Sequence, residues 1–475
     1  MKKFAIILIC FISGLFSYLI YPPSKFWFVA FFGFVPILLL IEIKKTSAGK
    51  FLLGFLAGFI FYATSLYWIS TVAKAYYLFI AFYLAFFWAI FFWLIFSFPP
   101  NLRIIYGMSL WYFLELIIQY LFTGFPWLPL SLSQWSFPTT ARIASIIGTA
   151  GLSALVMGTN ISIHIAIKEK KFFPLLICLL SITTLAYIPL LFSQKTNTHA
   201  FIRIAAIQGN AGYFGQIPEE SFEKYFRLTN TIRGKPDLVI WPESSYPSVL
   251  TEQHTAFKNL LEKSFDFPIL MGTLSKKDES IYNSAFLFKN GSFTKYDKIH
   301  LVPFGEYVPL SRLGLIRSLY KKFAGEIPEL TPGDSTTTFK LNSINFSVLI
   351  CFENIFPFLV QTNLKYNPNF FVTITNDSWY NRSAGPYQHF AHNIFRAIET
   401  GRPVVQVSTT GITGFSTPDG YFELFEKNGQ NIMVEGVMEI YLSKKDVKNP
   451  FYASVKEIGI SVLFLILTGT FLCRK

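Results

Sequence analysis

Residues 345–357 read NFSVLICFENIFP and place a lone cysteine at the end of a β-rich run. The apolar run 346–350 predicts a short buried strand, and Cys351 follows it directly. An acid, Glu353, comes two residues later. Free cysteine is among the most buried residue types, so Cys351 alone fits either the core end of a strand or a nucleophile held at a strand tip. The surrounding sequence has to decide between these two interpretations.

Further β-rich runs with turn residues at their ends flank this stretch. They are FIRIAAIQGN (201–210), DLVIWPE (237–243), FPILMGTLS (267–275), SAFLFKNG (284–291), FFVTITND (370–377) and PVVQVSTTG (403–411). Helical patterns separate several of them, as in PEESFEKYFRLTNTI (218–232) and HFAHNIFRAIETG (389–401). This alternation indicates an α/β domain of layered sheets and helices. We predict that the domain occupies residues 198–448 and buries its own core.

The remainder of the 475-residue chain is strongly apolar. The whole chain is 52% hydrophobic and only 15% charged, whereas a soluble domain carries about a quarter charged residues. A helix needs about 20 apolar residues to cross a bilayer. Candidate spans lie near 4–21, 26–43, 51–70, 76–98, 104–121, 143–167, 173–193 and 456–473. The first lacks the cleavage site of a signal peptide, so we predict seven transmembrane helices in residues 1–197 and an eighth in residues 449–475.

Basic residues predict which side of the membrane each loop occupies. One set of ends and loops contains Lys2, Lys3, Lys44, Lys45, Lys50, Arg103, Lys168, Lys170, Lys171, Arg474 and Lys475. The opposite loops contain fewer, so the positive-inside rule places both termini in the cytoplasm and the α/β domain outside. The net charge of +13 comes largely from these short runs and not from one basic patch, which argues against nucleic-acid binding.

Three residue types that acyl transfer through a thiol requires occur near predicted strand ends. Besides Cys351, the carboxylate of Glu243 is a candidate general base, because partial burial would raise its pKa toward a useful value. Lys298, in KYDKIHLVPFGEYVP (295–309), offers a positive charge that would favour a thiolate and stabilise an oxyanion. Each residue also has an ordinary explanation, namely a turn carboxylate, a solvated lysine and a core cysteine.

An ordered set of motifs resembles the signature blocks of the apolipoprotein N-acyltransferase family, the integral-membrane branch of the nitrilase (carbon–nitrogen hydrolase) superfamily. The motifs are TGFPW (123–127), IQGN (207–210), VIWPESSYP (239–247), YDKIHLVPFGEYVP (296–309), ICFENIFP (350–357) and NDSWYNRSAGPYQHFAHNIFRAIETGRPVVQVSTTGITGFSTPDG (376–420). The pattern of seven spans, a domain and one span is also similar, so the resemblance covers essentially the whole chain. It implies a polytopic helical membrane protein with an inserted αββα nitrilase-like domain.

The resemblance also implies roles for individual residues. Glu243 would be the general base, Lys298 would steady the tetrahedral intermediate, and Cys351 would carry the acyl group as a thioester. Glu306 and Glu353 match further acids that the family needs for activity. The implied reaction is ping-pong: the sn-1 acyl chain of a phospholipid, typically phosphatidylethanolamine, passes to the cysteine and then to the α-amine of a diacylglyceryl-cysteine lipoprotein.

Neither a cofactor nor a metal is implied by this chemistry. The resemblance further implies a monomer in the bacterial inner membrane, with its catalytic domain on the periplasmic side. Candidate lipid-handling residues lie in loops that are rich in aromatic and apolar side chains, since such segments settle at membrane interfaces. These candidates are Trp127, Trp379, Tyr380, Leu315 and Ile316.

Two positions depart from the family pattern. Phe352 follows the nucleophile where many members carry tyrosine, so a ring is kept but a hydroxyl is lost. After IQGN no tryptophan corresponds to one that some members use, and Tyr213 or Phe214 stands nearby. Substrate positioning is therefore less strongly implied than the three catalytic roles.

Other interpretations use the same residues differently. A membrane-anchored amidase would pass the acyl group to water, and a silent scaffold or lipid-binding protein would not need Cys351. A papain-like pair would need a histidine such as His300, but the cysteine's neighbourhood does not resemble that family. His389 and His392 lie three apart on a predicted helix, which favours helix packing over a metal site.

Glu115 is an acid inside the fifth predicted span. Acids within a membrane are functional candidates by default. A position near an interface, or pairing with Gln119, explains it equally well.

Overall fold

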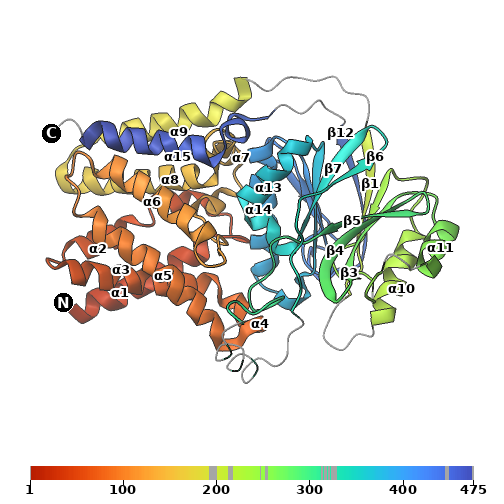
Figure 1. The fold of residues 1–475 in the computed structure, drawn as a ribbon. Coiled ribbons are helices and arrows are strands. Elements are labelled where there is room, and N and C mark those ends of the chain that lie inside the picture. Colours follow the sequence, from red (N-terminus) through yellow and green to blue (C-terminus); the bar gives the residue numbers. More distant parts are fainter. Residues whose placement is uncertain are drawn as a thin grey trace.

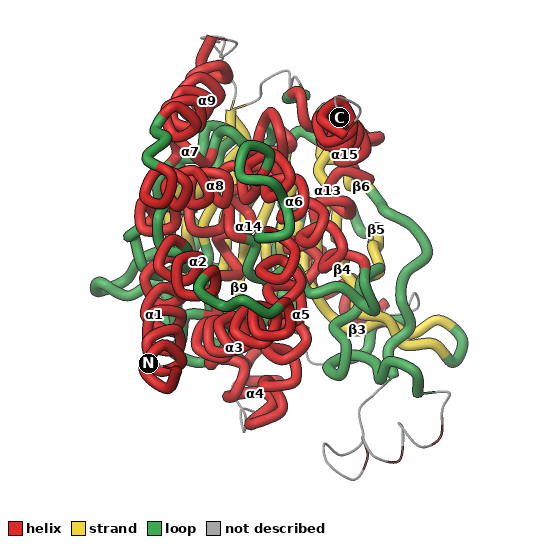
Figure 2. Tube along the Cα trace, turned by 90° about the vertical axis from the view of Figure 1, so that its left-hand side faces the viewer, coloured by secondary structure: helices red, strands yellow, loops and turns green. Residues whose placement is uncertain are grey.

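The computed structural model describes residues 2–191, 201–211, 218–246, 248–251, 255–311, 314, 318, 321, 329–443 and 449–472. Within these ranges a bundle of helices lies beside a sandwich of two β-sheets (Figure 1). Figure 2 views the molecule from the bundle side and shows helices in front with strands behind them. The labelled N and C ends both lie at the side of the bundle that faces away from the sheets (Figure 1).

The bundle is built from long apolar helices and short connecting turns. Its main helices are α1 (Lys2–Ile20), α2 (Val35–Glu42), α3 (Ser47–Ser65), α5 (Tyr77–Ile95), α6 (Arg103–Tyr120), α8 (Ala144–Glu169), α9 (Phe173–Leu191) and α15 (Phe451–Leu472). The connecting elements are η1 (Trp27–Phe31), η2 (Tyr67–Ile69), α4 (Ser70–Ala73), η3 (Lys74–Tyr76), η4 (Leu130–Gln134) and α7 (Pro138–Ala141). Helices that are apolar all round require either a large core or lipid around them. Large side chains such as Phe11, Leu52 and Phe79 are indeed exposed on the bundle surface.

Helices occur at all eight positions where the sequence predicts spans. Among the described residues, three helical stretches are long and apolar enough to cross a membrane: Ser47–Ser65, Tyr67–Ile95 and Ala144–Glu169. Shorter apolar helices lie at Ile6–Ile20, Trp27–Glu42 and Phe173–Pro189. The membrane character is therefore supported, while the full count of eight crossings stays a prediction.

The sandwich contains two six-stranded sheets, ordered β12-β1-β2-β3-β4-β5 and β11-β10-β9-β8-β7-β6. The first sheet uses β1 (Phe201–Gln208), β2 (Leu238–Ile240), β3 (Ile269–Lys277), β4 (Ser280–Lys289), β5 (Ser292–Asp297) and β12 (Gly436–Ser443). The second uses β6 (Thr338–Leu341), β7 (Ile344–Ile350), β8 (Phe370–Thr375), β9 (Val404–Ser408), β10 (Gly414–Ser416) and β11 (Phe422–Leu424). The central strands β1–β2–β3 and β7–β8–β9 run parallel, so their carboxyl ends meet at common edges.

Side chains alternate between the two faces of each sheet, as a β-strand requires. In β7, Val348 and Ile350 enter the core between the sheets, whereas Leu349 packs outward. Helices α10 (Pro218–Thr229) and α11 (Thr255–Ser264) pack on the outer face of the first sheet. Helices α13 (Pro357–Asn363) and α14 (Gly385–Thr400) pack on the outer face of the second, and the short η6 (Leu364–Tyr366) follows α13. The resulting αββα layering confirms the predicted domain class.

Helix α14 lies between the second sheet and the bundle (Figure 1). Nearly all of its residues are buried although its sequence has polar side chains on one face. The bundle supplies their partners: Gln388 Oε1 accepts hydrogen bonds from Trp68 Nε1 at 2.9 Å and Trp127 Nε1 at 3.0 Å. Glu399 Oε1 accepts one from the Thr149 N–H at 2.8 Å. One helix thus joins the sandwich to the bundle.

Candidate active site

Cys351 begins the short helix η5 (Cys351–Ile355), directly after β7. Its φ of 52° lies in the left-handed region, which costs a non-glycine residue about 1–2 kcal/mol. Backbone strain of this kind persists only where surrounding contacts hold it, and it clusters at active sites. The tight turn at the end of a buried strand is the geometry that the sequence predicts for a nucleophile.

The carboxylate of Glu353 fastens this turn to the loop that follows Lys298. It accepts hydrogen bonds from the Ile350 N–H (2.8 Å), the Tyr296 hydroxyl (2.8 Å), the Ile299 N–H (2.8 Å) and the His300 N–H (3.1 Å). Burial raises the pKa of Glu353, while these donors favour the ionised form and oppose the rise. Glu353 is therefore a brace between Lys298 and Cys351.

Replacing Glu353 with glutamine should destabilise the protein by about 2–4 kcal/mol. All the partners of the carboxylate are hydrogen-bond donors, and the NH₂ group of glutamine, itself a donor, cannot accept a bond from any of them. Acyl transfer should fall with it, since the brace sets the spacing of two site residues. Unfolding of the purified protein in detergent measures the first effect. Glu439→Gln is the matched control: its exposed ion pair with Arg203, at 2.7 Å, should contribute less than about 1 kcal/mol. A Glu353→Gln protein as stable as the wild type would contradict the brace.

Glu243 lies just after β2, and its carboxylate is buried in the site. Oε2 accepts the Asn376 N–H at 2.7 Å, and Oε1 accepts the Asn283 side-chain amide at 2.6 Å. Burial raises the pKa of Glu243, and the nearby Lys298 only partly offsets the rise. A carboxylate with a raised pKa accepts a proton near neutral pH better than an exposed one, as a general base must.

Lys298 directly follows β5, and its ammonium group is completely enclosed by carboxylates and protein. Nζ lies 2.9 Å from Glu306 Oε2 and 3.9 Å from Glu243 Oε1. Burial disfavours the charge of the lysine, but Glu306, Glu243 and Cys351 outweigh burial and raise the pKa of Lys298 above its usual value. The lysine is therefore a permanent cation in this site and cannot act as a base.

Glu306 is held in place from two sides. Its carboxylate accepts the Asn283 amide at 2.7 Å and the Val302 N–H at 2.7 Å. Asn283 thus bridges the two acids, Glu243 and Glu306, that flank Lys298. We infer that Glu306 fixes the lysine and leaves Glu243 available for proton transfer.

The surroundings of Cys351 act on its thiol in opposite directions. Burial raises its pKa well above the usual cysteine value, and Glu243 adds to the rise. Lys298 lowers the thiol pKa, as the sequence predicts, but its effect is smaller than that of burial. The surroundings therefore favour the neutral thiol of Cys351, next to the carboxyl group of Glu243.

Aromatic rings from both parts of the molecule surround the nucleophile. Trp127, from the bundle, lies 6.3 Å from Phe352 and 6.1 Å from Tyr380 between ring centroids. Tyr380 in turn packs on Trp68 of the bundle at 4.5 Å. Of the lipid-handling candidates, Trp127 and Tyr380 therefore meet near Cys351, at the junction of bundle and sandwich.

The other lipid-handling candidates lie elsewhere. Trp379, in η7 (Asp377–Tyr380), is exposed, and its carbonyl accepts a hydrogen bond from Thr71 Oγ1 at 2.9 Å. Leu315 and Ile316 fall outside the described residues, as do Tyr213 and Phe214. Their proposed contact with lipid stays a prediction.

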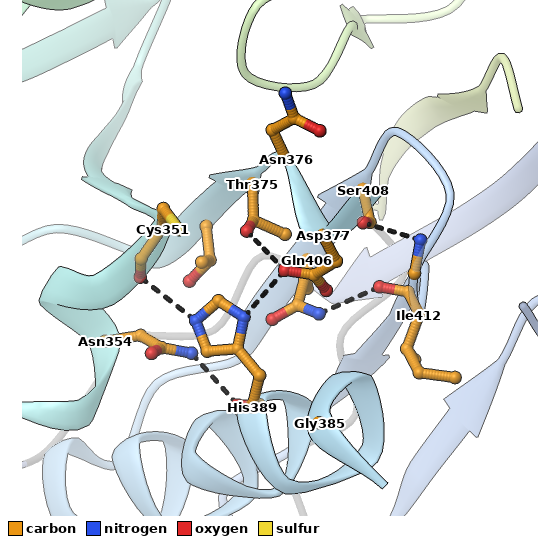
Figure 3. Close-up of polar contacts among 12 residues, drawn as sticks. Cys351, Asn354, Thr375, Asn376, Asp377, Gly385, His389, Gln406, Ser408 and Ile412 are labelled. Carbon is orange, nitrogen blue, oxygen red and sulfur yellow. Dashed lines mark hydrogen bonds and ion pairs between the residues drawn. The ribbon is translucent and has the colours of Figure 1, made fainter. Parts of the chain in front are cut away.

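The two histidines of α14 are both buried, as helix packing predicts, and each bonds a backbone carbonyl. His389 Nε2 lies 3.2 Å from the carbonyl oxygen of Cys351, and His392 Nε2 lies 2.9 Å from that of Trp127. Figure 3 shows the Cys351 carbonyl turned toward the His389 ring. Within the part of the chain that is described, no three histidine, cysteine or acidic side chains are grouped as metal ligands would be.

Glu115 braces the loop that carries Trp127. Its Oε1 accepts hydrogen bonds from Trp111 Nε1 at 2.9 Å and from the Leu130 N–H at 2.9 Å. The carboxylate is buried between α6 and this loop. We therefore infer that Glu115 holds the loop that contains Trp127 in place and takes no part in the chemistry.

Comparisons with known proteins place two family models on the chain. The apolipoprotein N-acyltransferase N-terminal domain matches residues 13–162, and the carbon–nitrogen hydrolase domain matches residues 203–436. An apolipoprotein N-acyltransferase of Geobacter metallireducens is 30% identical over 469 residues, which cover 90% of this chain and 89% of that protein. One from Wigglesworthia glossinidia brevipalpis is 28% identical over 433 residues, covering 84% and 85%. Among solved structures, Nit3 of Saccharomyces cerevisiae, a nitrilase-superfamily member, is 18% identical and covers 56% of this chain and 97% of its own, with a TM-score of 0.39.

Proposed function

The chain belongs to the apolipoprotein N-acyltransferase family, and from this premise we propose that Glu243, Lys298 and Cys351 are its catalytic residues. The enzyme transfers an acyl chain from a phospholipid to the N-terminal amine of a diacylglyceryl-cysteine lipoprotein. One observation supports the proposed site most strongly: Trp127 of the bundle faces Phe352, the residue beside the nucleophile. A site closed on one side by the membrane part can receive substrates that are anchored in a bilayer.

In the first half-reaction, Glu243 takes the proton of the Cys351 thiol, and the sulfur attacks the sn-1 ester carbonyl. The carbonyl oxygen becomes an oxyanion, which the fixed charge of Lys298 stabilises. The C–O bond to the glycerol then breaks, and the proton on Glu243 passes to the departing oxygen. A lysophospholipid leaves, and the acyl chain stays on Cys351 as a thioester.

In the second half-reaction Glu243 and Lys298 keep their roles, and the sulfur of Cys351 becomes the leaving group. The neutral α-amine of the lipoprotein attacks the thioester carbonyl, Glu243 accepts a proton from the nitrogen, and Lys298 again faces the oxyanion. The C–S bond breaks, the sulfur regains a proton, and an amide is released. Phe352 and Trp127 would limit the access of water to the thioester, because water would convert the transferase into a hydrolase.

Intact-mass measurement on the purified protein tests this function directly. Incubation with phosphatidylethanolamine should add one fatty-acyl mass to Cys351. Subsequent addition of a diacylglyceryl-cysteine peptide should remove that mass and acylate the peptide's amine. An adduct that decays only to free fatty acid would favour the amidase-like alternative, and the absence of any adduct in active lipid would exclude Cys351 as the acyl carrier.

The pH dependence of acyl-enzyme formation should have an acid limb above the ordinary pKa of a glutamic acid, because the base must be deprotonated and its pKa is raised. Asn283 donates to Glu243 and lowers that pKa, so Asn283→Leu should move the limb to higher pH. The rate of adduct formation, followed by mass at several pH values, measures the shift. Asn230→Leu, in the exposed turn after α10, is the matched control and should leave the limb in place. If the acid limb lies at the same pH in Asn283→Leu as in the wild type, Glu243 is not the base that titrates.

For the orientation, we propose that the sandwich lies on the periplasmic side of the bacterial inner membrane and that both termini are cytoplasmic. The chain ends lie at the far side of the bundle from the sheets (Figure 1). Glu42, at the end of α2, forms ion pairs with two basic residues. Arg103 Nη1 lies 3.6 Å from its Oε1, and Lys168 Nζ lies 3.4 Å from its Oε2. Such basic residues favour the cytoplasmic face. The domain boundaries at residues 197 and 448 and the monomeric state belong to the same proposal.

A further inference from the structure

Beneath the nucleophile, a chain of buried polar groups runs from β8 to α14 and returns to Cys351 (Figure 3). Thr375 Oγ1 donates a hydrogen bond to Asp377 Oδ1 at 2.8 Å. His389 Nδ1 lies 3.0 Å from the same carboxylate oxygen. Its other ring nitrogen, Nε2, lies 3.2 Å from the carbonyl oxygen of Cys351. None of these side chains is more than 7% exposed.

The chemistry of these partners determines where the hydrogens are. A backbone carbonyl can only accept, so Nε2 of His389 must carry a hydrogen to bond Cys351. On the other side, the ring and the carboxylate of Asp377 share one further proton between Nδ1 and Oδ1. If that proton were missing, the lone pair of Nδ1 would face a carboxylate oxygen directly. With its other nitrogen held by Asp377, the ring therefore directs Nε2–H at the carbonyl oxygen of Cys351.

We propose that His389, oriented by Asp377, is a positioning residue for the acylation of Cys351. Its Nε2–H holds the carbonyl of a residue whose backbone lies in the strained left-handed region. Figure 3 shows that carbonyl directed into α14, while the sulfur lies away from the ring. The contact thus fixes the direction in which the thiol leaves the turn. The proposal rests on Cys351 being the acylated residue.

The same contact acts on the next peptide N–H. In a trans peptide the carbonyl and the N–H point in opposite directions, so holding the Cys351 carbonyl also sets the direction of the Phe352 N–H. A hydrogen bond at the carbonyl polarises the peptide and strengthens its N–H as a donor. Backbone N–H groups beside a nucleophile are the type of group that stabilises an oxyanion. His389 therefore acts through the peptide that joins Cys351 to Phe352.

Two amide substitutions separate the two contacts of the ring. In His389→Gln the amide nitrogen is as many covalent bonds from the backbone as Nε2, so a donor for the Cys351 carbonyl is kept. In His389→Asn the amide nitrogen is as many bonds from the backbone as Nδ1, so only the contact with Asp377 is kept. We expect acyl-enzyme formation at saturating phosphatidylethanolamine to slow about 10²-fold in His389→Asn, as for a misplaced nucleophile. His389→Gln should retain most of the rate. The phospholipid concentration for half-saturation should change little in either.

Thermal midpoints measured on the same preparations separate positioning from folding. The proposal is overturned if the two variants acylate at equal rates, whether both match the wild type or both are equally slow. If neither folds, Asp377→Asn provides the test, because its amide oxygen would keep the single ring hydrogen on Nδ1 and leave Nε2 without one. A folded Asp377→Asn protein that acylates at the wild-type rate overturns the proposal. A wild-type protein that forms no adduct would instead refute the proposed function itself.

Discussion

Replacing Cys351 with serine should reduce acyl transfer by at least about 10³-fold. A serine hydroxyl is a far weaker acid than a thiol, and the buried carboxylate of Glu243 cannot deprotonate it in a site that already raises the pKa of the thiol. The substitution changes one atom, so the fold should persist. Intact mass after incubation with phosphatidylethanolamine should show no acyl adduct, and the thermal midpoint should stay near that of the wild type.

Cys178→Ser provides the matched control for this variant. Cys178 is also buried and lies in α9, where its sulfur is 3.1 Å from Ser162 Oγ. The control should form the adduct at the wild-type rate, because this cysteine is on the bundle and away from the strand ends. Transfer by Cys351→Ser at a comparable rate would place the acyl group on another residue and refute the mechanism.

Replacing Lys298 with methionine should damage both catalysis and stability. Without the ammonium group, the buried Glu243 and the partly buried Glu306 would lie beside each other with no compensating charge. Loss of one partner of a buried ion pair costs about 3–5 kcal/mol, and loss of an oxyanion-stabilising group costs about 10²–10³-fold in rate. Denaturant unfolding and the rate of adduct formation measure the two effects.

Lys295→Met is the control for Lys298→Met. Lys295 lies in β5, the strand that Lys298 follows, and pairs with Asp297 at 3.0 Å, but both side chains are partly exposed. That change should cost less than about 1 kcal/mol and leave the rate unchanged. Adding Glu306→Gln to Lys298→Met should restore part of the stability, since one uncompensated charge is removed, but not the rate. Recovery of the rate in the double variant would show that the lysine's charge is not needed for chemistry.

Glu243 and Cys351 could be selected from the sequence because each follows a recognisable β-run, and Lys298 because its positive charge suits the same chemistry. The structure brings Lys298 within 3.9 Å of Glu243 and places Cys351 at the end of β7. The motifs also identified the family correctly, since they recur in order along the chain. The role of Glu353 was only implied by the resemblance; the four hydrogen bonds that it accepts now give a structural reason for an acid at this position.

Other parts of the site could not be predicted, because their partners are distant in sequence. Asn283 lies in the middle of β4 and bridges Glu243 to Glu306, and a buried polar residue inside an apolar strand was the only local sign of it. His389 was correctly predicted to pack within a helix, yet nothing local indicated that it bonds the nucleophile's own carbonyl. Asp377, in a quoted motif, likewise had no assigned partner.

The membrane part shows the same limit. Apolar runs locate its helices well, but α3 ends at Ser65, whereas the sequence predicted a span to residue 70. There the chain turns through η2 and brings Trp68 against Tyr380 of the sandwich. Hydropathy does not distinguish a tryptophan in a span from one that packs on a soluble domain. The contacts that complete the site are therefore tertiary in origin.

Helix α14 is buried by the second sheet on one side and by the bundle on the other, and this has a consequence for the biosynthesis of the enzyme. A sandwich expressed alone would expose the face of this helix that contacts Trp68 and Trp127. That face includes Gln388, whose three partners, Trp68, Trp127 and Ser65, all lie in the bundle. We therefore expect an excised catalytic domain to be insoluble or poorly ordered. During synthesis bundle helices α1 to α9 emerge before the sandwich, so Trp68 and Trp127, which contact α14, exist before that helix does. Activity would then arise only in chains already inserted in the membrane, where the substrates are.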